Sequence, residues 1–418
     1  MSSAPPADSA PATTRVRDDV AVIGLVGLAH SISHFSQLLL APLFPWLKDA
    51  FAVSYAQLGL LMTIFFVVSC SVQALSGFLV DRVGPRPVLL SGLALLGIAA
   101  FGFAASTTYA MLAAFSVLAG IGNGVFHPVD YTLLNRKVHA ARLGHAFSVH
   151  GITGSLGWGL APAMLVPLTL AFSWRVALAS AGALAFAVLL VLWVARRHLA
   201  LGKMAAAMKP THAGRAAGHD GGAFDFLRIP AVWMCFAFFF FYAVALSGVQ
   251  AFAPEAARLL HGVPAGVSAM CLTIYMFASA GGMVLGGFLA SNPERCERIV
   301  GVGFGAAATI ALVIGFAAIA PGVVPVLFGL MGFGAGIAAP SRDLLVKRSS
   351  PENATGRVYG VVYSGLDIGQ ALAPLLFGTL MDTHHPSQVW LGIAVVQLVM
   401  VGSAFRVRKV RRTVLVPA

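Results

Sequence analysis

Apolar stretches of about 20 residues recur along this chain, and that is the length an α-helix needs to cross the hydrocarbon core of a bilayer. Twelve such stretches occur, in two sets of six separated by a polar segment. They cover residues 20–44, 55–80, 87–106, 109–129, 145–170 and 174–195, and then 230–252, 267–290, 299–320, 323–341, 358–380 and 388–405. The sequence therefore predicts an all-α membrane protein with twelve transmembrane helices.

The composition excludes the main soluble classes. Charged residues make up 10% of the 418 residues, against about 25% in a typical soluble domain, and the mean hydropathy is +0.86. A cytosolic enzyme, a disordered chain and a secreted disulfide scaffold do not have this balance. The four cysteines (Cys70, Cys235, Cys271 and Cys296) form no C-x-x-C pair, so we expect them to pack without a disulfide or a metal.

The positive charges indicate orientation. A net charge of +12 is typical of nucleic-acid-binding proteins, but here the charges fall between the apolar runs and not along one basic face. With the N-terminus placed in the cytoplasm, 24 of the 27 Lys and Arg fall on the cytoplasmic side, and only Lys48, Arg175 and Arg258 fall outside. This asymmetry follows the positive-inside rule. It predicts a bacterial inner-membrane protein with both termini cytoplasmic and with no nucleic-acid partner.

The two sets of spans are copies of one another. At a shift of about 212 residues, GIGNGVFHPVD (120–130) aligns with GFGAGIAAPSR (332–342), and GHAFSVHGITGSLGWGLAP (144–162) aligns with GRVYGVVYSGLDIGQALAP (356–374). Six spans per copy return the second copy to the membrane in the same orientation, which makes the copies parallel repeats. Two six-helix bundles that rock around a central site would give alternating-access transport, although a duplication without transport would leave the same pattern.

These observations divide the chain into five segments. They are a disordered cytoplasmic tail at 1–19, a first six-helix bundle at 20–198, a cytoplasmic linker at 199–228, a second six-helix bundle at 229–406 and a basic cytoplasmic tail at 407–418.

The loop between the second and third spans is GFLVDRVGPR, residues 77–86. In it, Gly77 would allow close helix packing, Gly84 would allow a tight turn, and Asp81 could cap a helix N-terminus. Arg82 and Arg86 would pair with Asp130 at the inner end of the fourth span. We therefore expect a conformational latch, meaning ion pairs at the cytoplasmic end that hold one access state.

This loop resembles the signature loop of the major facilitator superfamily. The segment AHSISHFSQLLLAPLFPWLKDAFAVSYAQLGLL (29–61), together with FHP (126–128), is similar to the fosmidomycin-resistance-type exporters of that superfamily, with His34 where their pattern has an acid. The resemblance implies the twelve-helix fold of two parallel repeats and transport of a small molecule. The superfamily's proton-coupling Arg in the fourth helix would fall near Ser116 in this chain, which has no Arg there.

Polar residues inside the spans are costly in a bilayer and usually face the interior of the bundle. The first span carries His30, His34 and Gln37 on one face, where they could contact substrate or protons, pack structurally, or hold a metal. The fourth span carries Asn123, His127 and Asp130, and His127 with His150 would form either an inner gate or a structural pair.

The eleventh span carries Tyr363, Asp367 and Gln370. Asp367 is the carboxylate that we place deepest in a span, and reversible protonation would cancel the cost of burying it. It would therefore couple transport to protons, unless it is held in a fixed ion pair or hydrogen bond. Gln250, near the outer end of the seventh span, would line the cavity.

Together these features predict a secondary active transporter that moves a small organic molecule by alternating access, most simply a proton-coupled exporter of a drug or metabolite. An importer of an organic acid or other nutrient is the first alternative, and a transition-metal permease using His30 and His34 is the second. We place no Lys or Arg in mid-membrane, which favours a neutral, zwitterionic or singly charged substrate. We expect a monomer in the lipid bilayer, no cofactor, no resident metal and no enzymatic activity.

Overall fold

The computed structural model describes residues 12–139, 142–201, 230–289, 295–349 and 355–415, and this part of the chain is almost entirely α-helical, with no β-strand in it. The helices of the first half are α1 (Ala12–Gln37), α2 (Phe44–Phe51), α3 (Tyr55–Val83), α4 (Pro85–Ala105), α5 (Tyr109–Asn123), α6 (Phe126–Lys137), α7 (Leu143–Ala171) and α8 (Trp174–Val194). Those of the second half are α10 (Pro230–Ala251), α11 (Ala253–His261), α12 (Ala265–Leu289), α13 (Cys296–Phe316), α14 (Val324–Ser349), α15 (Thr355–Asp382) and α16 (Pro386–Leu415).

Ten helical stretches in the described residues are long and apolar enough to cross a membrane. The helices α15 and α16 occupy the positions of the last two predicted spans. The all-α membrane fold predicted from the sequence is therefore confirmed, and the protein is a multi-pass membrane protein.

Two of the predicted spans are broken in the structure. The predicted helix 20–44 ends at Gln37, and the chain then passes through a short 3₁₀ turn (Ala41–Leu43) into α2. The predicted helix 109–129 is interrupted after Asn123 and resumes as α6. Prolines explain both breaks: Pro42, Pro45 and Pro128 each lack the N–H that a continuous helix would use.

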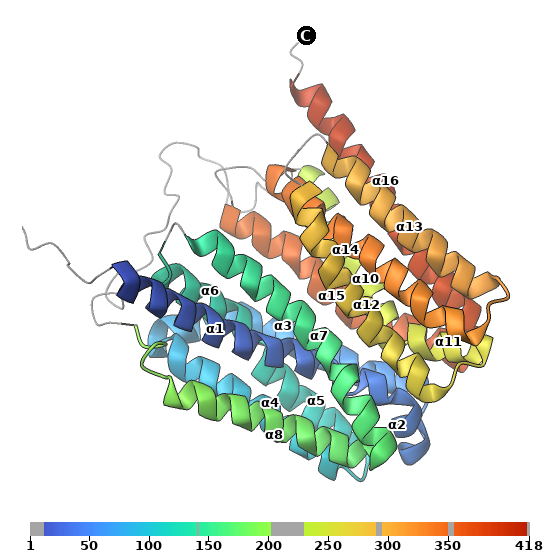
Figure 1. Cartoon of the computed structure of the whole chain (residues 1–418), viewed down its shortest axis with the longest axis horizontal. Coiled ribbons are helices and arrows are strands. Elements are labelled where there is room, and N and C mark those ends of the chain that lie inside the picture. Colours follow the sequence, from blue (N-terminus) through green and yellow to red (C-terminus); the bar gives the residue numbers. More distant parts are fainter. Residues whose placement is uncertain (1–11, 140–141, 202–229, 290–294, 350–354, 416–418) are drawn as a thin grey trace, which may run out of the picture.

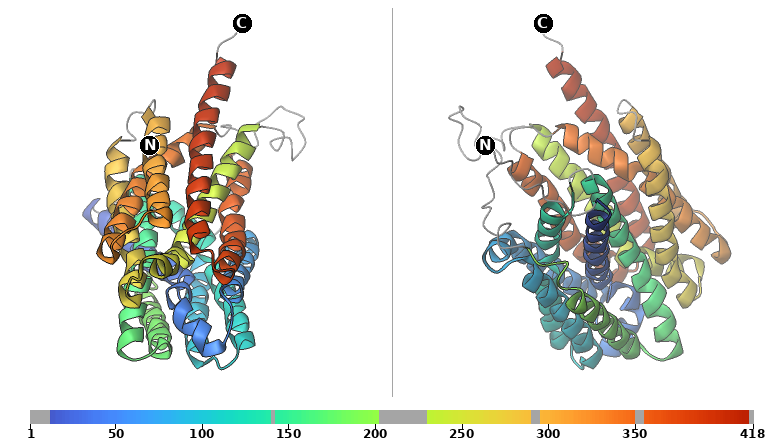
Figure 2. Two further views of the ribbon diagram at one scale, coloured as in Figure 1. Left: turned by 90° about the vertical axis from the view of Figure 1, so that its right-hand side faces the viewer. Right: turned by 60° about the vertical axis from the view of Figure 1, so that its left-hand side comes forward.

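The two halves form separate bundles that meet along two helix pairs, α3 against α15 and α7 against α12. In Figure 1 the bundles lie closest together at lower right, near α2 and α11, and diverge toward the upper left. In both views of Figure 2 most helices of the first half lie below those of the second half. We call the end with α2 and α11 the closed end. Gly59 and Gly378 lie against backbone of the opposite half there, because only a residue without a side chain permits so close an approach.

Polar contacts also join the halves at the closed end. The carboxylate of Asp382, at the end of α15, accepts hydrogen bonds from the backbone N–H groups of Tyr55 (2.7 Å) and Ala56 (2.8 Å), and so caps the N-terminus of α3. The Tyr55 hydroxyl donates to Glu255 of α11 at 2.8 Å. Arg258 donates two hydrogen bonds to that same carboxylate, which raise the pKa of its guanidinium above the usual value.

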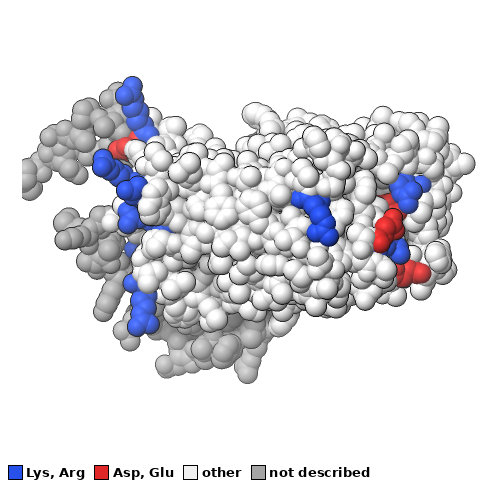
Figure 3. Space-filling view, turned by 90° about the horizontal axis from the view of Figure 1, so that it is seen from below, with Lys and Arg blue, Asp and Glu red and all other residues white. Residues whose placement is uncertain are grey.

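Exposed charge gathers mainly toward the two ends of the molecule. On the face in Figure 3, Lys and Arg gather at the end away from α2 and α11, which we call the basic end, while most of the length between the ends is uncharged. Large apolar side chains, among them Phe78 and Phe288, are exposed on the helices. An apolar surface between two charged ends is typical of a protein that spans a bilayer, with its ends in the two aqueous phases.

Candidate transport site

Four histidines and one aspartate meet where α1, α6 and α7 come together. His30 and His34 belong to α1, His127 and Asp130 to α6, and His150 to α7. The ring centroids of His30 and His34 are 4.4 Å apart, and those of His30 and His127 are 5.3 Å apart. We call these five residues the histidine cluster. The structure thus brings together residues that the sequence places on three separate predicted spans.

Asp130 is the centre of the histidine cluster and has no exposed surface. Its Oδ2 atom lies 3.0 Å from Nδ1 of His30 and 3.1 Å from Nε2 of His150. The rings of His30 and His150 stack with their centroids 3.5 Å apart. An ionised carboxylate is expensive to bury without a partner, and here the partners are imidazoles from two other helices.

This geometry overturns the predicted latch pairing of Asp130 with Arg82 and Arg86. The side chain of Asp130 points into the bundle toward His30 and His150, and not toward the loop at the basic end. The sequence placed Asp130 at the inner end of the fourth span but could not show which face of α6 packs inward.

The loop at 77–86 has a different set of contacts. Asp81 approaches Arg136 of the same half at 4.0 Å, and the Asp81 side chain is largely exposed while that of Arg136 is partly exposed. Gly84 has a φ of +87°, a conformation that glycine adopts without strain, as the predicted turn requires. A Cβ at Gly77 would meet nothing within 4 Å, so the close packing expected at Gly77 is absent from this conformation.

A second group of side chains extends the site toward the closed end. The Trp158 ring of α7 lies 4.3 Å from the His34 ring, and its Nε1 donates to the side-chain oxygen of Gln37 at 3.0 Å. Both ring nitrogens of His34 are buried without a hydrogen-bond partner. Gly154 makes room for His34, because a Cβ at this position would lie 2.8 Å from its ring. The stripe predicted on the first span thus faces α7, and Trp158 is a member of the site that sequence reasoning missed.

Asn123 has a structural position. Its side-chain oxygen accepts a hydrogen bond from Ser33 of α1 (2.7 Å), and its amide donates to Ser69 of α3 (2.8 Å). This chain of hydrogen bonds ties α1, α3 and α5 together beside the histidine cluster, and neither serine was singled out from the sequence.

Asp367, in the second half, lies at the boundary between the bundles. It is half-buried in α15 and lies beside Cys70 of α3. Gln370, one turn further along, is buried with its side-chain oxygen unpartnered. Tyr363 lies in α15, but its side chain is outside the described part of the chain.

Arg342 is a further polar member of the second half. Its guanidinium lies 4.2 Å from the ring centroid of Tyr242, near the middle of α10, and 5.4 Å from that of Phe239. From the sequence, Arg342 belongs to a cytoplasmic loop, and no Lys or Arg is predicted in the middle of the membrane. That placement is wrong, because the side chain extends from the end of a span back along the bundle, as long basic side chains can.

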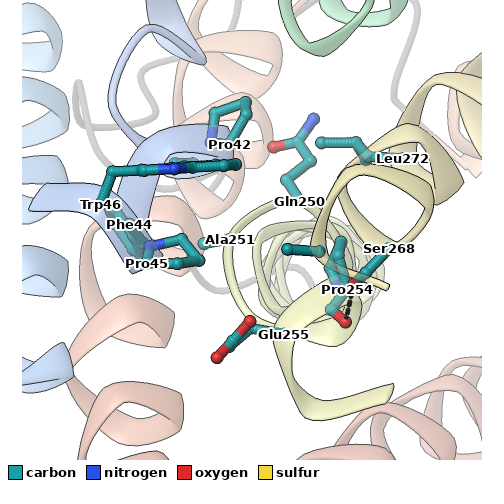
Figure 4. Close-up of a pocket in the computed structure, with 12 residues that line it drawn as sticks. Pro42, Phe44, Pro45, Trp46, Gln250, Ala251, Pro254, Glu255, Ser268 and Leu272 are labelled. Carbon is teal, nitrogen blue, oxygen red and sulfur yellow. Dashed lines mark hydrogen bonds between the residues drawn. The ribbon is translucent and has the colours of Figure 1, made fainter. Parts of the chain in front are cut away.

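Gln250 lies elsewhere, in a pocket at the closed end between α2 and the helices α10, α11 and α12 (Figure 4). It is 1% exposed, and neither of its amide atoms has a hydrogen-bond partner. Figure 4 shows its side chain beside Pro42 and Leu272, with Trp46 and Glu255 also on the pocket wall. Gln250 therefore lines a cavity as predicted, but one at the seam between the halves.

Comparison with known proteins agrees with this architecture. The model of the Major Facilitator Superfamily matches residues 26–374, most of the chain. The chain belongs to the Major Facilitator Superfamily. It is therefore a member of a transporter family and not of an enzyme family, and the family resemblance seen in the loop at 77–86 is confirmed.

Among its relatives, the chain is 30% identical over 167 residues to the Fosmidomycin resistance protein of Escherichia coli K12, covering 38% of this chain and 39% of that one. It is 25% identical over 171 residues to the Probable sulfoacetate transporter SauU of Cupriavidus necator, covering 40% and 39%. These alignments span less than half the length of either relative.

Solved structures share the fold over almost the whole chain. A bacterial homologue of the human lysosomal transporter Spinster, in an inward-facing and occupied conformation, superposes with a TM-score of 0.76 at 15% identity over 96% of this chain and 98% of that one. The nucleoside transporter NupG superposes with a TM-score of 0.72 at 15% identity, over 91% and 99%.

Proposed function

We propose that this superfamily member is a proton-driven exporter of a small organic molecule in a bacterial inner membrane. In this proposal the basic end and both termini face the cytoplasm, as the distribution of Lys and Arg favours. The substrate enters between the bundles from the basic end, where they diverge (Figure 1). It leaves after the closed end has opened.

The observation that carries the proton coupling is the contact between Asp367 and Cys70. It joins a carboxylate of α15 to a thiol of α3, and so crosses between the two halves. An ionised carboxylate accepts a hydrogen bond from a neighbouring thiol more strongly than a protonated one does. Gain of a proton would therefore loosen a contact between the bundles, which is what a coupling group must do.

The substrate class follows from the groups around the site. Trp158, His34 and Gln37 offer an aromatic face and hydrogen-bonding groups, and Arg342 adds a positive charge in the second half. These suit a small organic molecule that carries at most one negative charge. The name of the Escherichia coli relative supports including fosmidomycin among the compounds tested.

The test is growth of an efflux-deficient host that expresses the chain, against a compound panel that includes fosmidomycin, with and without a protonophore. We expect protection that disappears with the protonophore. We also expect Asp367→Asn to lose proton-driven flux in everted vesicles while Asp49→Asn, which changes an exposed acid on α2, retains it. Full flux through Asp367→Asn would contradict the proposal.

The same assay distinguishes the importer. Sensitisation of the host, or uptake of an organic acid that follows an inward proton gradient, would reverse the direction and favour the alternative that the name of SauU suggests. Protection that persists with the protonophore would leave export but remove proton coupling.

A further inference from the structure

We propose that the histidine cluster contains a binding site for one divalent transition-metal ion, formed by His30, His127, His150 and Asp130. The ion would be of the Zn²⁺, Co²⁺ or Ni²⁺ type. This inference goes beyond the proposed export function and does not depend on it.

The first argument is the spacing of the donor atoms. One ligand nitrogen each from His30, His127 and His150 lies within 4.8 Å of the others. In a tetrahedral site with metal–ligand bonds of about 2.0–2.1 Å, neighbouring donors are about 3.3 Å apart. Asp130 is not part of that group of three, but its Oδ2 atom lies 3.0 Å and 3.1 Å from nitrogens of His30 and His150. A metal bound by all four residues therefore requires His127 to move toward the other three.

The second argument is the arrangement on the helices. His127 and Asp130 are three residues apart on α6, which places both on one face. His30 and His150 approach that face from α1 and α7. Metal sites inside helical bundles are built in this way, from an acid and a histidine at i, i+3 on one helix with further ligands from facing helices.

The third argument is that donor atoms in the cluster are unsatisfied. Nδ1 of His127 and Oδ1 of Asp130 are buried without a hydrogen-bond partner, and Nδ1 of His30 has no well-oriented one. Buried polar atoms in native proteins are nearly always paired. A bound metal would provide a partner for these unpaired nitrogen and oxygen atoms. Donor sets rich in imidazole favour Zn²⁺, Co²⁺ and Ni²⁺ over Mg²⁺ and Ca²⁺.

The geometry also changes which histidines are the expected metal ligands. The spacing of four residues in the sequence pairs His30 with His34, but the donor set in the structure combines His30 with His127 and His150. His34 instead lies against Trp158. Replacing His34 is therefore a sharp internal comparison, since it removes an imidazole from the cluster but none from the donor set.

The test uses Co²⁺ as a spectroscopic probe on the purified full-length chain in detergent. We expect one Co²⁺ per chain with the visible absorption of a tetrahedral site, and a binding weakened about tenfold or more in His127→Ala and Asp130→Asn. His34→Ala should bind within about threefold of the unchanged chain. His145→Ala, which changes an exposed histidine of α7, should bind equally well.

A cooperative thermal unfolding transition of each variant shows that it is folded, and Zn²⁺ should raise that transition in the unchanged chain and less in His127→Ala. Absence of Co²⁺ absorption in the folded unchanged chain would overturn the proposal. So would equal Co²⁺ binding by His127→Ala and His145→Ala. Neither result bears on proton-driven flux, which Asp367→Asn tests separately.

Discussion

The closed end and the basic end of this transporter are held in different ways. At the closed end, Asp382 and Glu255 of the second half accept hydrogen bonds from residues of the first. At the basic end, the ion pair of the loop at 77–86, Asp81 with Arg136, stays within the first half and is partly exposed. The hydrogen bonds of Asp382 and Glu255 therefore join the bundles at the closed end, and transport must break them.

The largest effect should come from overpacking the seam. A Cβ at Gly59 would lie 2.5 Å from the backbone oxygen of Pro374. Overpacking costs about 1–3 kcal/mol, so Gly59→Val should reduce the closed-end population about tenfold. The measurement is the distance between spin labels carried by unnatural amino acids at exposed positions 49 and 259 on α2 and α11, which leaves the four native cysteines in place. Gly305→Val, which has open space around it, is the control, and equal distances in both variants would contradict the account.

Removal of the helix cap should have a smaller effect. Asp382→Ala loses both hydrogen bonds to the N-terminus of α3, and loss of such a cap costs about 1 kcal/mol. The same label pair should show a longer distance in roughly five times as many molecules as in the unchanged chain. Asp382→Asn, which keeps one oxygen acceptor, should lie between the two. An unchanged distribution would show that the cap does not hold the seam.

The hydroxyl of Tyr55 should matter less still. Tyr55→Phe removes one hydrogen bond to Glu255, whose carboxylate keeps both bonds from Arg258. A typical hydrogen bond contributes about 0.5–1.5 kcal/mol. We therefore expect Tyr55→Phe to shift the distances between the closed-end labels less than Asp382→Ala does. A shift larger than that of Asp382→Ala would reverse the ranking of the two contacts.

The basic end should respond least. Exposed ion pairs contribute about 0–1 kcal/mol, and Asp81 is largely exposed while Arg136 is partly exposed. Asp81→Asn should leave the distance between labels at positions 83 and 289, on α3 and α12, unchanged in the absence of substrate. A clear increase or decrease would show that the loop at 77–86 acts as a latch in this conformation as well.

The fold was largely predictable because span length and repetition are local properties of the sequence. The break after Gln37 was not predicted, because an apolar run does not show where prolines such as Pro42 and Pro45 interrupt the helix. The site was predictable in part: a stripe such as His30, His34 and Gln37 shows which residues share a face, but not which helix that face meets. Thus Asp130 was paired with the arginines of the loop at 77–86, and Trp158 was missed because an aromatic residue in an apolar run carries no distinguishing signal.

The charged and capping residues show the same limit. Arg342 lies at the end of a span, and only the direction of its side chain shows that it reaches Tyr242. Asp382 and Tyr55 are 327 residues apart in the chain, and no periodicity relates them.

The most direct test of proton coupling through Asp367 measures the closed-end labels in the unchanged chain, in Asp367→Asn and in Asp81→Asn as the pH falls from about 8 to about 5. In the unchanged chain and in Asp81→Asn, protonation should weaken the contact with Cys70, so the fraction of molecules with a separated closed end should rise as the pH falls. In Asp367→Asn, which has no carboxylate to titrate at this position, that fraction should stay constant. A response of Asp367→Asn equal to that of the unchanged chain would contradict the account.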